Sequence, residues 1–168
     1  MVSTATEALV QQLAAELLAR GWMLATAESC TGGLIAGACT DLAGSSAWLE
    51  RGFVTYSNAA KTQMLGVDAA LIAQHGAVSE PVARAMAQGA LQHAQAQVAL
   101  AVTGVAGPGG GSADKPVGTV WFGWAVNGQV ISEVQHFAGD RAAVRQATVR
   151  HSLQRLLELL QTPATADT

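Results

Sequence analysis

Two apolar runs separated by Asn127-Gly128 constrain the fold of this chain more than any other segment. Gly118–Val126 and Val130–Phe137 each have the length and the β-branched and aromatic content of a strand. The Asn-Gly pair favours the tight turn whose twist matches that of a two-stranded ribbon. We therefore predict an antiparallel hairpin, so any sheet that contains these runs has at least one antiparallel pair.

The other apolar segments alternate between strand-like and helix-like patterns. Strands are predicted at Trp22–Ala27, Phe53–Tyr56 and Gln97–Thr103. Five helices are predicted: one through Leu9–Leu18 that ends at Gly21, one opened by Gly32 and Gly33 that runs toward Leu42, a short one capped by Asn58, one that begins at Ser79-Glu80-Pro81 with Ser79 as its cap, and a closing one over Ala142–Leu160. This alternation predicts an α/β fold with a mixed, mostly parallel sheet that contains one antiparallel hairpin and carries helices on both faces.

The length of 168 residues suits one compact domain, and no linker or internal repeat is visible. We predict a single domain over residues 1–168, with its core at about 7–160 and a tail at 161–168. Half of the residues are hydrophobic and 12% are charged, which excludes an extended disordered protein.

The charge and the cysteines restrict partners and location. A net charge of −3 provides no basic surface for nucleic acid. No apolar run is long enough to span a bilayer, and the first residues do not resemble a secretory signal. Cys30 and Cys39 are most simply reduced thiols. We predict a cytoplasmic protein without a nucleic-acid or membrane partner. The histidines, cysteines and carboxylates show no metal-ligand spacing, so no metal is predicted.

Ser29 lies at the junction between a predicted strand and a predicted helix. Backbone N–H groups at a helix start stabilise a developing oxyanion, and here they belong to Cys30, Thr31, Gly32 and Gly33. Ser29 is therefore a candidate nucleophile. The alternative is that Ser29 or Thr31 merely caps the helix. Cys30 is a rival nucleophile, because helix starts favour thiolates.

A serine nucleophile needs a base. The four histidines have no spacing that ties them to Ser29, and seven of the nine basic residues are arginines, which stay charged. Lys61 follows a predicted strand end, where burial can lower a lysine pKa from about 10.4 to roughly 7–8. Lys61 is the candidate base, and a solvated helix residue is the alternative. Tyr56 can orient Lys61 or relay its proton, or it can simply pack on the core.

The long segment Gly104–Pro116 contains no predicted core residue, which is typical of a functional or mobile loop. Its glycines let consecutive N–H groups point into one concavity, as a phosphate requires. The pattern is neither a Walker A motif nor a dinucleotide fingerprint, so no cofactor is predicted. The alternative is a flexible surface loop. Candidates for nucleotide binding in and around it are Thr103, Gly104, Gly107, Gly109, Gly110, Gly111, Lys115, Arg141 and Arg145, although the arginines can also be solvated helix charges.

Five segments of the chain carry a family resemblance: Ala27–Gly33, Gly52–Asn58, His75–Glu80, Thr103–Pro108 and Lys115–Val120. In this order they resemble the CinA C-terminal family, which contains bacterial nicotinamide-nucleotide amidases. The resemblance implies a three-layer α/β/α fold and hydrolysis of nicotinamide mononucleotide to nicotinic acid mononucleotide and ammonia.

The same resemblance implies a catalytic pair of Ser29 and Lys61. Glu28 and Asn58, which lie within the matching segments, are added as candidates for substrate contacts. The family resemblance and the apolar composition together favour a homo-oligomer, with a dimer preferred. Three other functions stay open at this point: an amidase for a different amide substrate, a non-catalytic nucleotide-binding module, and a structural subunit of an assembly.

Overall fold

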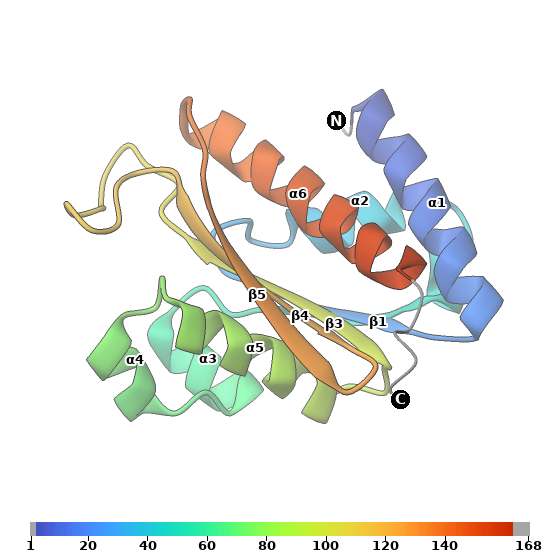
Figure 1. Ribbon diagram of the computed structural model, residues 1–168, viewed down its shortest axis with the longest axis horizontal. Coiled ribbons are helices and arrows are strands. Elements are labelled where there is room, and N and C mark those ends of the chain that lie inside the picture. The colour runs from blue at the N-terminus through green and yellow to red at the C-terminus, as the bar shows by residue number, and fades with distance from the viewer. Residues whose placement is uncertain (1–2, 163–168) are drawn as a thin grey trace.

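The computed structural model describes residues 3–162 as one five-stranded sheet with helices packed against it (Figure 1). The strands lie in the order β2-β1-β3-β4-β5. Their bounds are β1 Leu24–Glu28, β2 Leu49–Val54, β3 Val98–Gly104, β4 Thr119–Val126 and β5 Gln129–His136. The α/β class and the hairpin are thereby confirmed.

The sheet has two parallel and two antiparallel strand pairs, so the prediction that most pairs are parallel is wrong. β1 pairs in parallel with both β2 and β3, whereas β4 pairs antiparallel with both β3 and β5. The reason lies in the segment between β3 and β4. A parallel pair needs a crossover, usually a helix, but this segment contains none and returns to the same edge as a loop.

Helices cover both faces of the sheet (Figure 1). One face carries α1 (Thr4–Arg20), α2 (Leu34–Thr40) and α6 (Arg141–Gln161); the other carries α3 (Asn58–Leu65), α4 (Ala69–His75) and α5 (Glu80–Gln92). Each face has its own buried apolar cluster. Leu13, Trp124 and Leu153 belong to the first cluster, and Leu65, Val82 and Met86 to the second.

Three details of the helices differ from the sequence prediction. Ser57 caps α3 instead of Asn58, because the Ala60 amide donates to Ser57 Oγ at 3.0 Å. Ser79 occupies the predicted N-cap position of α5, but its hydroxyl makes no capping hydrogen bond and donates to the Gly76 carbonyl at 2.7 Å. Helix α4 was not predicted, since Ile72 is its one buried residue and seven positions reveal no period.

The observed ends of two other elements also differ from the predicted ones. Strand β2 begins and ends earlier than Phe53–Tyr56, because it is an edge strand in which Phe53 is the buried position. Helix α6 includes Gln161, so the predicted tail begins too early, and its residues 163–168 lie outside the described part of the chain. Within residues 3–162, no helix is both long and apolar enough to cross a membrane.

The topology brings several chain segments to one edge of the sheet. Glu28 at the end of β1 is paired with both Val54 and Val102, so three parallel strands end side by side. Ser29, the segment after Val54 and the loop after Gly104 therefore leave the sheet at the same edge. Such edges are where open α/β sheets bind ligands.

Candidate active site

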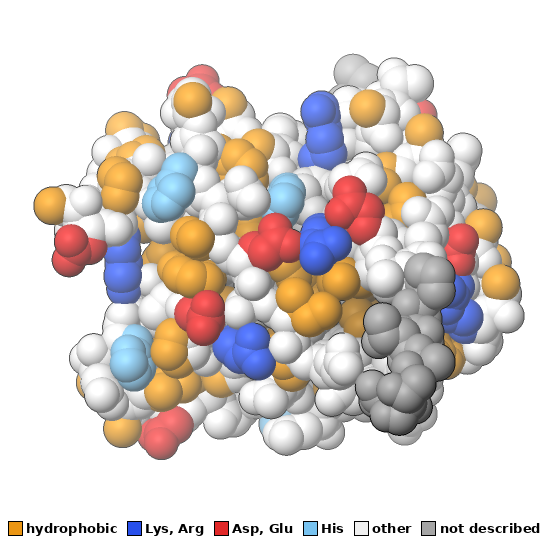
Figure 2. Space-filling view, in the orientation of Figure 1, with side chains coloured by type: hydrophobic (Ala, Val, Ile, Leu, Met, Phe, Trp, Pro, Cys, Tyr) orange, Lys and Arg blue, Asp and Glu red, His pale blue; other side chains and the backbone are white. Residues whose placement is uncertain are grey.

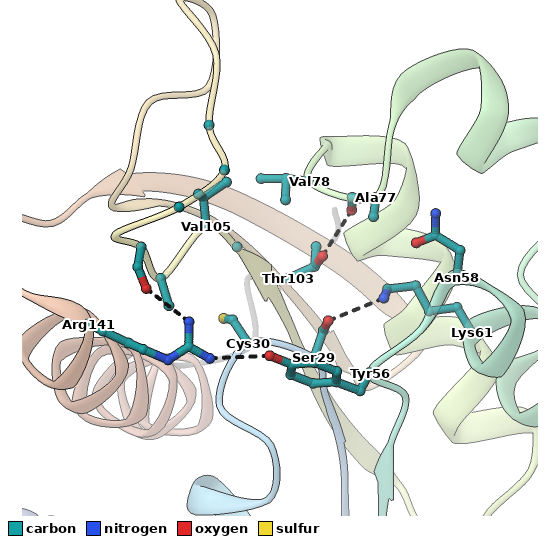
Figure 3. Close-up of a pocket in the computed structure, with 16 residues that line it drawn as sticks. Ser29, Cys30, Tyr56, Asn58, Lys61, Ala77, Val78, Thr103, Val105 and Arg141 are labelled. Atoms are coloured by element: carbon teal, nitrogen blue, oxygen red, sulfur yellow. Dashed lines mark hydrogen bonds between the residues drawn. The ribbon is translucent and has the colours of Figure 1, made fainter.

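A cavity of about 320 Å³ opens at the carboxyl edge of the parallel strands (Figure 3). The structure brings twelve of the predicted site residues to it: Ser29, Cys30, Tyr56, Asn58, Lys61, Thr103, Gly104, Gly107, Gly109, Gly110, Gly111 and Arg141. Four further lining residues, Ala77, Val78, Val105 and Ala106, were missed. Their side chains are small or apolar, and the one signal for them is their place inside the matching segments His75–Glu80 and Thr103–Pro108.

Ser29 and Lys61 meet on the floor of this cavity. Lys61 Nζ lies 3.2 Å from Ser29 Oγ, and it also donates to the carbonyl of Thr55 at 3.1 Å. The Lys61 side chain is 1% exposed, so it is not the solvated helix residue of the alternative prediction. Lysine reaches the serine because α3 begins directly after β2, which places its first turn beside the end of β1.

Burial lowers the pKa of Lys61 below its usual value of 10.5. Desolvation acts against the ammonium form, and among the described residues no carboxylate forms an ion pair with Lys61. The nearby Cys30 has a smaller, opposite effect on this pKa. A lysine whose pKa is lowered gives up its proton more readily, which suits a base close to a hydroxyl.

Glu28 is not placed in the cavity, contrary to the prediction of a substrate contact. Its carboxylate is 1% exposed and is directed at the start of α2. It accepts hydrogen bonds from the Ile35 amide at 2.8 Å, the Ala36 amide at 3.0 Å and the Thr31 hydroxyl at 2.5 Å. Glu28 therefore satisfies the free N–H groups of α2, the task that a capping residue performs. Neither Ser29 nor Thr31 caps this helix; Gly33 occupies the N-cap position without a side chain.

The turn after Ser29 is held from the other side by Arg145. The guanidinium of Arg145 donates to the carbonyls of Cys30 at 3.2 Å and Thr31 at 3.1 Å. Arg145 does not line the cavity, although its candidate role was to bind phosphate. Thr31, Gly32 and Gly33 also lie outside the lining. The amide of Gly32 is used within the turn, because it donates to the Ser29 carbonyl at 3.0 Å.

Arg141 bridges two sides of the cavity (Figure 3). Its guanidinium donates to the Gly107 carbonyl at 3.0 Å and to the Tyr56 hydroxyl at 3.2 Å. The Tyr56 hydroxyl thus contacts Arg141 and not Lys61, which differs from the predicted orienting or relay role. The side chain of Tyr56 is 61% exposed, so it does not pack on the core either.

The loop after β3 forms one wall of the cavity. Lys115 lies outside the lining and braces the loop, since its Nζ donates to the carbonyl of His75 at 2.7 Å. Gly107 has a positive φ of 84°, and an added Cβ would lie 2.4 Å from Val117 Cγ1, so this position accepts only glycine without rearrangement. Ala106 is buried, which corrects the expectation that the loop contributes nothing to the core. Thr103 lines the cavity, and its hydroxyl donates to the Ala77 carbonyl at 3.0 Å.

The thiol of Cys30 also lines the cavity, but it is a poor nucleophile. Burial raises its pKa to about 11, which outweighs the opposing effects of a backbone hydrogen bond and of Arg145 and Lys61. A thiol with this pKa is protonated near neutral pH. Both Cys30 and Cys39 are free. Within residues 3–162, no group of three or more His, Cys, Asp or Glu side chains is arranged to hold a metal ion.

The chain is similar to known proteins over most of its length. The chain is 58% identical over 147 residues to the nicotinamide-nucleotide amidohydrolase PncC of Enterobacter agglomerans, which covers 87% of this chain and 90% of that protein. It is 56% identical over 149 residues to the protein of the same name from Escherichia coli K12, covering 88% and 90%. The crystal structure of the competence/damage inducible protein CihA from Agrobacterium tumefaciens superposes with a TM-score of 0.93 at 48% identity, covering 96% of this chain and 99% of that one. Residues 6–160 match the CinA C-terminal domain, and the chain belongs to this family.

Proposed function

We propose that this protein is a nicotinamide-nucleotide amidohydrolase that converts nicotinamide mononucleotide and water to nicotinic acid mononucleotide and ammonia. The observation that carries the proposal is the 3.2 Å approach of the buried Lys61 to Ser29 Oγ in a cavity. The names of the relatives, which are more than half identical to this chain, supply the substrate.

The first half of the reaction forms an ester on Ser29. Neutral Lys61 accepts the hydroxyl proton while Ser29 Oγ attacks the carboxamide carbon. The tetrahedral intermediate then collapses as its C–N bond breaks. Protonated Lys61 returns the proton to the departing nitrogen, which leaves as ammonia. The Thr55 carbonyl keeps Lys61 Nζ beside the serine throughout, because it accepts a hydrogen bond from the same nitrogen.

The second half removes the ester with water. Lys61 accepts a proton from a water molecule as its oxygen attacks the ester carbon. The bond from that carbon to Ser29 Oγ breaks, and Lys61 returns the proton to the serine. Nicotinic acid mononucleotide is released, and the enzyme is restored. One base of shifted pKa thus serves both halves.

The oxyanion of both intermediates needs hydrogen-bond donors close to Ser29. Within residues 3–162, the backbone amides of Cys30 and Thr31 have no hydrogen-bond acceptor. Cys30 follows the serine directly and lines the cavity, and Thr31 is the next residue. We assign the oxyanion to these two amides, and we leave out Gly32, whose amide is already bonded.

Arg141 is the best placed cation for the phosphate of the nucleotide. Arg145 and Lys115 lie outside the cavity lining, whereas the Arg141 guanidinium is part of it. The glycine loop lines the same cavity as Arg141 and offers backbone N–H groups to a phosphate. The aromatic ring of Tyr56 and the apolar side chains of Val78 and Val105 border the space that remains for the pyridine.

The cellular location, the domain limits and the oligomeric state are proposed from the sequence and the family resemblance. The free cysteines fit a reducing, cytoplasmic environment. A single domain over residues 1–168 and a homodimer remain predictions from the sequence and the family resemblance.

One assay tests the proposed function: ammonia release by the wild type and by Ser29→Ala, with nicotinamide, its riboside and its mononucleotide as substrates. We expect turnover with the mononucleotide and a loss of at least about 10³-fold in Ser29→Ala. The Ser29→Ala protein should still bind the mononucleotide. A wild type that binds the mononucleotide without releasing ammonia would instead identify a non-catalytic binding module.

Arg141→Met tests the phosphate contact separately. We expect kcat/KM for the mononucleotide to fall, and kcat/KM for the riboside, which has no phosphate, to change little. Equal losses for both substrates would remove Arg141 from the phosphate site.

A further inference from the structure

We infer that Arg145 is a positioning residue for amide hydrolysis: by holding two carbonyls of the Ser29–Gly33 turn, it points the Thr31 amide at the oxyanion. The inference rests on the proposed function, because it concerns the same site. It assigns to Arg145 a role other than the phosphate contact that the sequence suggested.

The contacts of Arg145 are directed at the backbone of the turn. Its Nε donates to the Cys30 carbonyl at 3.2 Å and its Nη2 to the Thr31 carbonyl at 3.1 Å. Two adjacent carbonyls on one rigid guanidinium fix the plane of each peptide, which a flexible ammonium cannot do. The half-buried Arg145 comes from α6, whereas the turn follows β1, so the contact spans 115 positions of the chain.

Peptide geometry converts this contact into an orientation for an amide. A trans peptide is planar, and its C=O and N–H point in opposite directions. Because the Cys30 carbonyl is directed at Arg145, the Thr31 N–H is directed away from α6. Within residues 3–162, that N–H has no acceptor. The contact therefore leaves the Thr31 N–H as a free donor, two residues after the nucleophile.

The opposite side of the turn is held by Glu28. Its carboxylate accepts from the Thr31 hydroxyl at 2.5 Å and from two amides at the start of α2. Thr31 is thus fixed through its side chain by β1 and through its carbonyl by α6. A turn restrained at both points keeps its amides in place while charge develops, which is how preorganised donors accelerate a reaction.

The charge of Arg145 acts in the same direction. The guanidinium lowers the pKa of the Cys30 thiol, although burial raises that pKa more. Its field therefore reaches the residue after Ser29, where a negative charge forms on the substrate oxygen. Removing Arg145 should cost both orientation and electrostatic stabilisation.

The test compares Arg145→Met and Arg145→Lys with Arg150→Met, a control on the exposed side of the same helix. Ammonia release is measured with both the mononucleotide and the riboside, and thermal unfolding shows whether each variant is folded. We expect Arg145→Met to lower kcat about 10²-fold, the loss typical of a misplaced or missing oxyanion donor, with KM within about threefold of the wild type. Arg145→Lys should lose less, because it keeps the charge and one donor, and Arg150→Met should match the wild type.

In Arg145→Met, the ratio of kcat/KM for the mononucleotide to kcat/KM for the riboside should not change. A large fall in that ratio would make Arg145 a phosphate ligand and overturn the inference. An unchanged kcat in a folded variant would also overturn it. Added guanidinium ion at millimolar concentration should restore part of the kcat of Arg145→Met without changing its melting temperature, a response that a purely structural role would not give. If Arg145→Met does not fold, Arg145→Lys carries the same comparison. A wild type that releases no ammonia at all would refute the proposed function instead.

Discussion

Lys61 approaches Ser29 through the interior of the protein, with its Nζ 3.2 Å from the serine oxygen and its side chain 1% exposed. The same nitrogen donates to the Thr55 carbonyl, and the Thr55 amide donates to the Glu28 carbonyl at 2.9 Å. The position of the base is therefore set by the backbone at the ends of β1 and β2.

Replacing Lys61 with arginine should remove catalysis while keeping a positive charge. Arginine cannot give up its proton near neutral pH, so it cannot accept one from Ser29. We expect kcat to fall about 10²–10⁴-fold, the range for loss of a general base. In the wild type, kcat/KM should rise with pH as Lys61 loses its proton, with a midpoint below 10.5 because burial lowers this pKa. A pH–rate profile checks both statements, and the same limb surviving in Lys61→Arg would contradict them.

The buried lysine should also make stability depend on pH. Its pKa is lower in the folded protein than in the unfolded chain, so between the two values the unfolded chain binds more protons. The free energy of unfolding should therefore increase as pH rises through the folded pKa toward about 10.5, by at most about 1.4 kcal/mol per pH unit. Urea titrations of the wild type and Lys61→Met at several pH values measure the difference. Parallel pH profiles for the two proteins would show that the pKa of Lys61 is not lowered.

Cys30 should be dispensable for turnover. Its thiol is protonated near neutral pH, since burial raises the pKa to about 11. We expect Cys30→Ala to keep kcat within about threefold of the wild type, because alanine preserves the backbone amide that the mechanism uses. The buried thiol should react slowly with iodoacetamide, and ammonia release before and after treatment checks this. Loss of activity in Cys30→Ala comparable to that in Ser29→Ala would make the thiol the nucleophile.

Glu28→Gln should destabilise the fold more than its conservative shape suggests. The carboxylate accepts three hydrogen bonds with two oxygens, whereas the amide has one acceptor oxygen and turns an NH₂ group toward donors. We expect a loss of about 1–3 kcal/mol in the free energy of unfolding, measured in urea. Glu16→Gln is the matched control, since the ion pair of Glu16 with Arg20 is partly solvated and should contribute less than about 1 kcal/mol. Equal effects of the two substitutions would rule out a capping role for Glu28.

The sequence was most informative where local chemistry is strong. The Asn-Gly turn predicts the β4–β5 hairpin, and the scarcity of lysine makes Lys61, which lies 3.2 Å from Ser29 Oγ, the candidate base. Edge positions were harder to predict, because strand β2 buries little and shows no clear alternation. Helix α4, with one buried residue, left no periodic signal.

The roles of Glu28, Lys115 and Arg145 could not be read from the sequence for a different reason. Each side chain bonds to backbone groups that are brought near by the fold: the start of α2, the end of α4 and the turn after β1. Charge and position suggested ligand contacts for all three. A backbone acceptor or donor has no residue type, so sequence patterns carry no trace of such a partner.

Figure 2 shows positive and negative side chains scattered over one face of the molecule, with no large patch of either sign. The two arginines nearest the site come from the start of α6. This placement has a consequence for synthesis. The nucleophile and the base emerge from the ribosome early, but Arg141 and Arg145 belong to the last helix of the chain. A growing polypeptide therefore contains Ser29 and Lys61 before it contains Arg141 for the phosphate contact and Arg145 for the hydrogen bonds to the turn. A chain that ends before α6 therefore lacks both arginines, and with them the proposed phosphate contact and the two hydrogen bonds to the turn after Ser29.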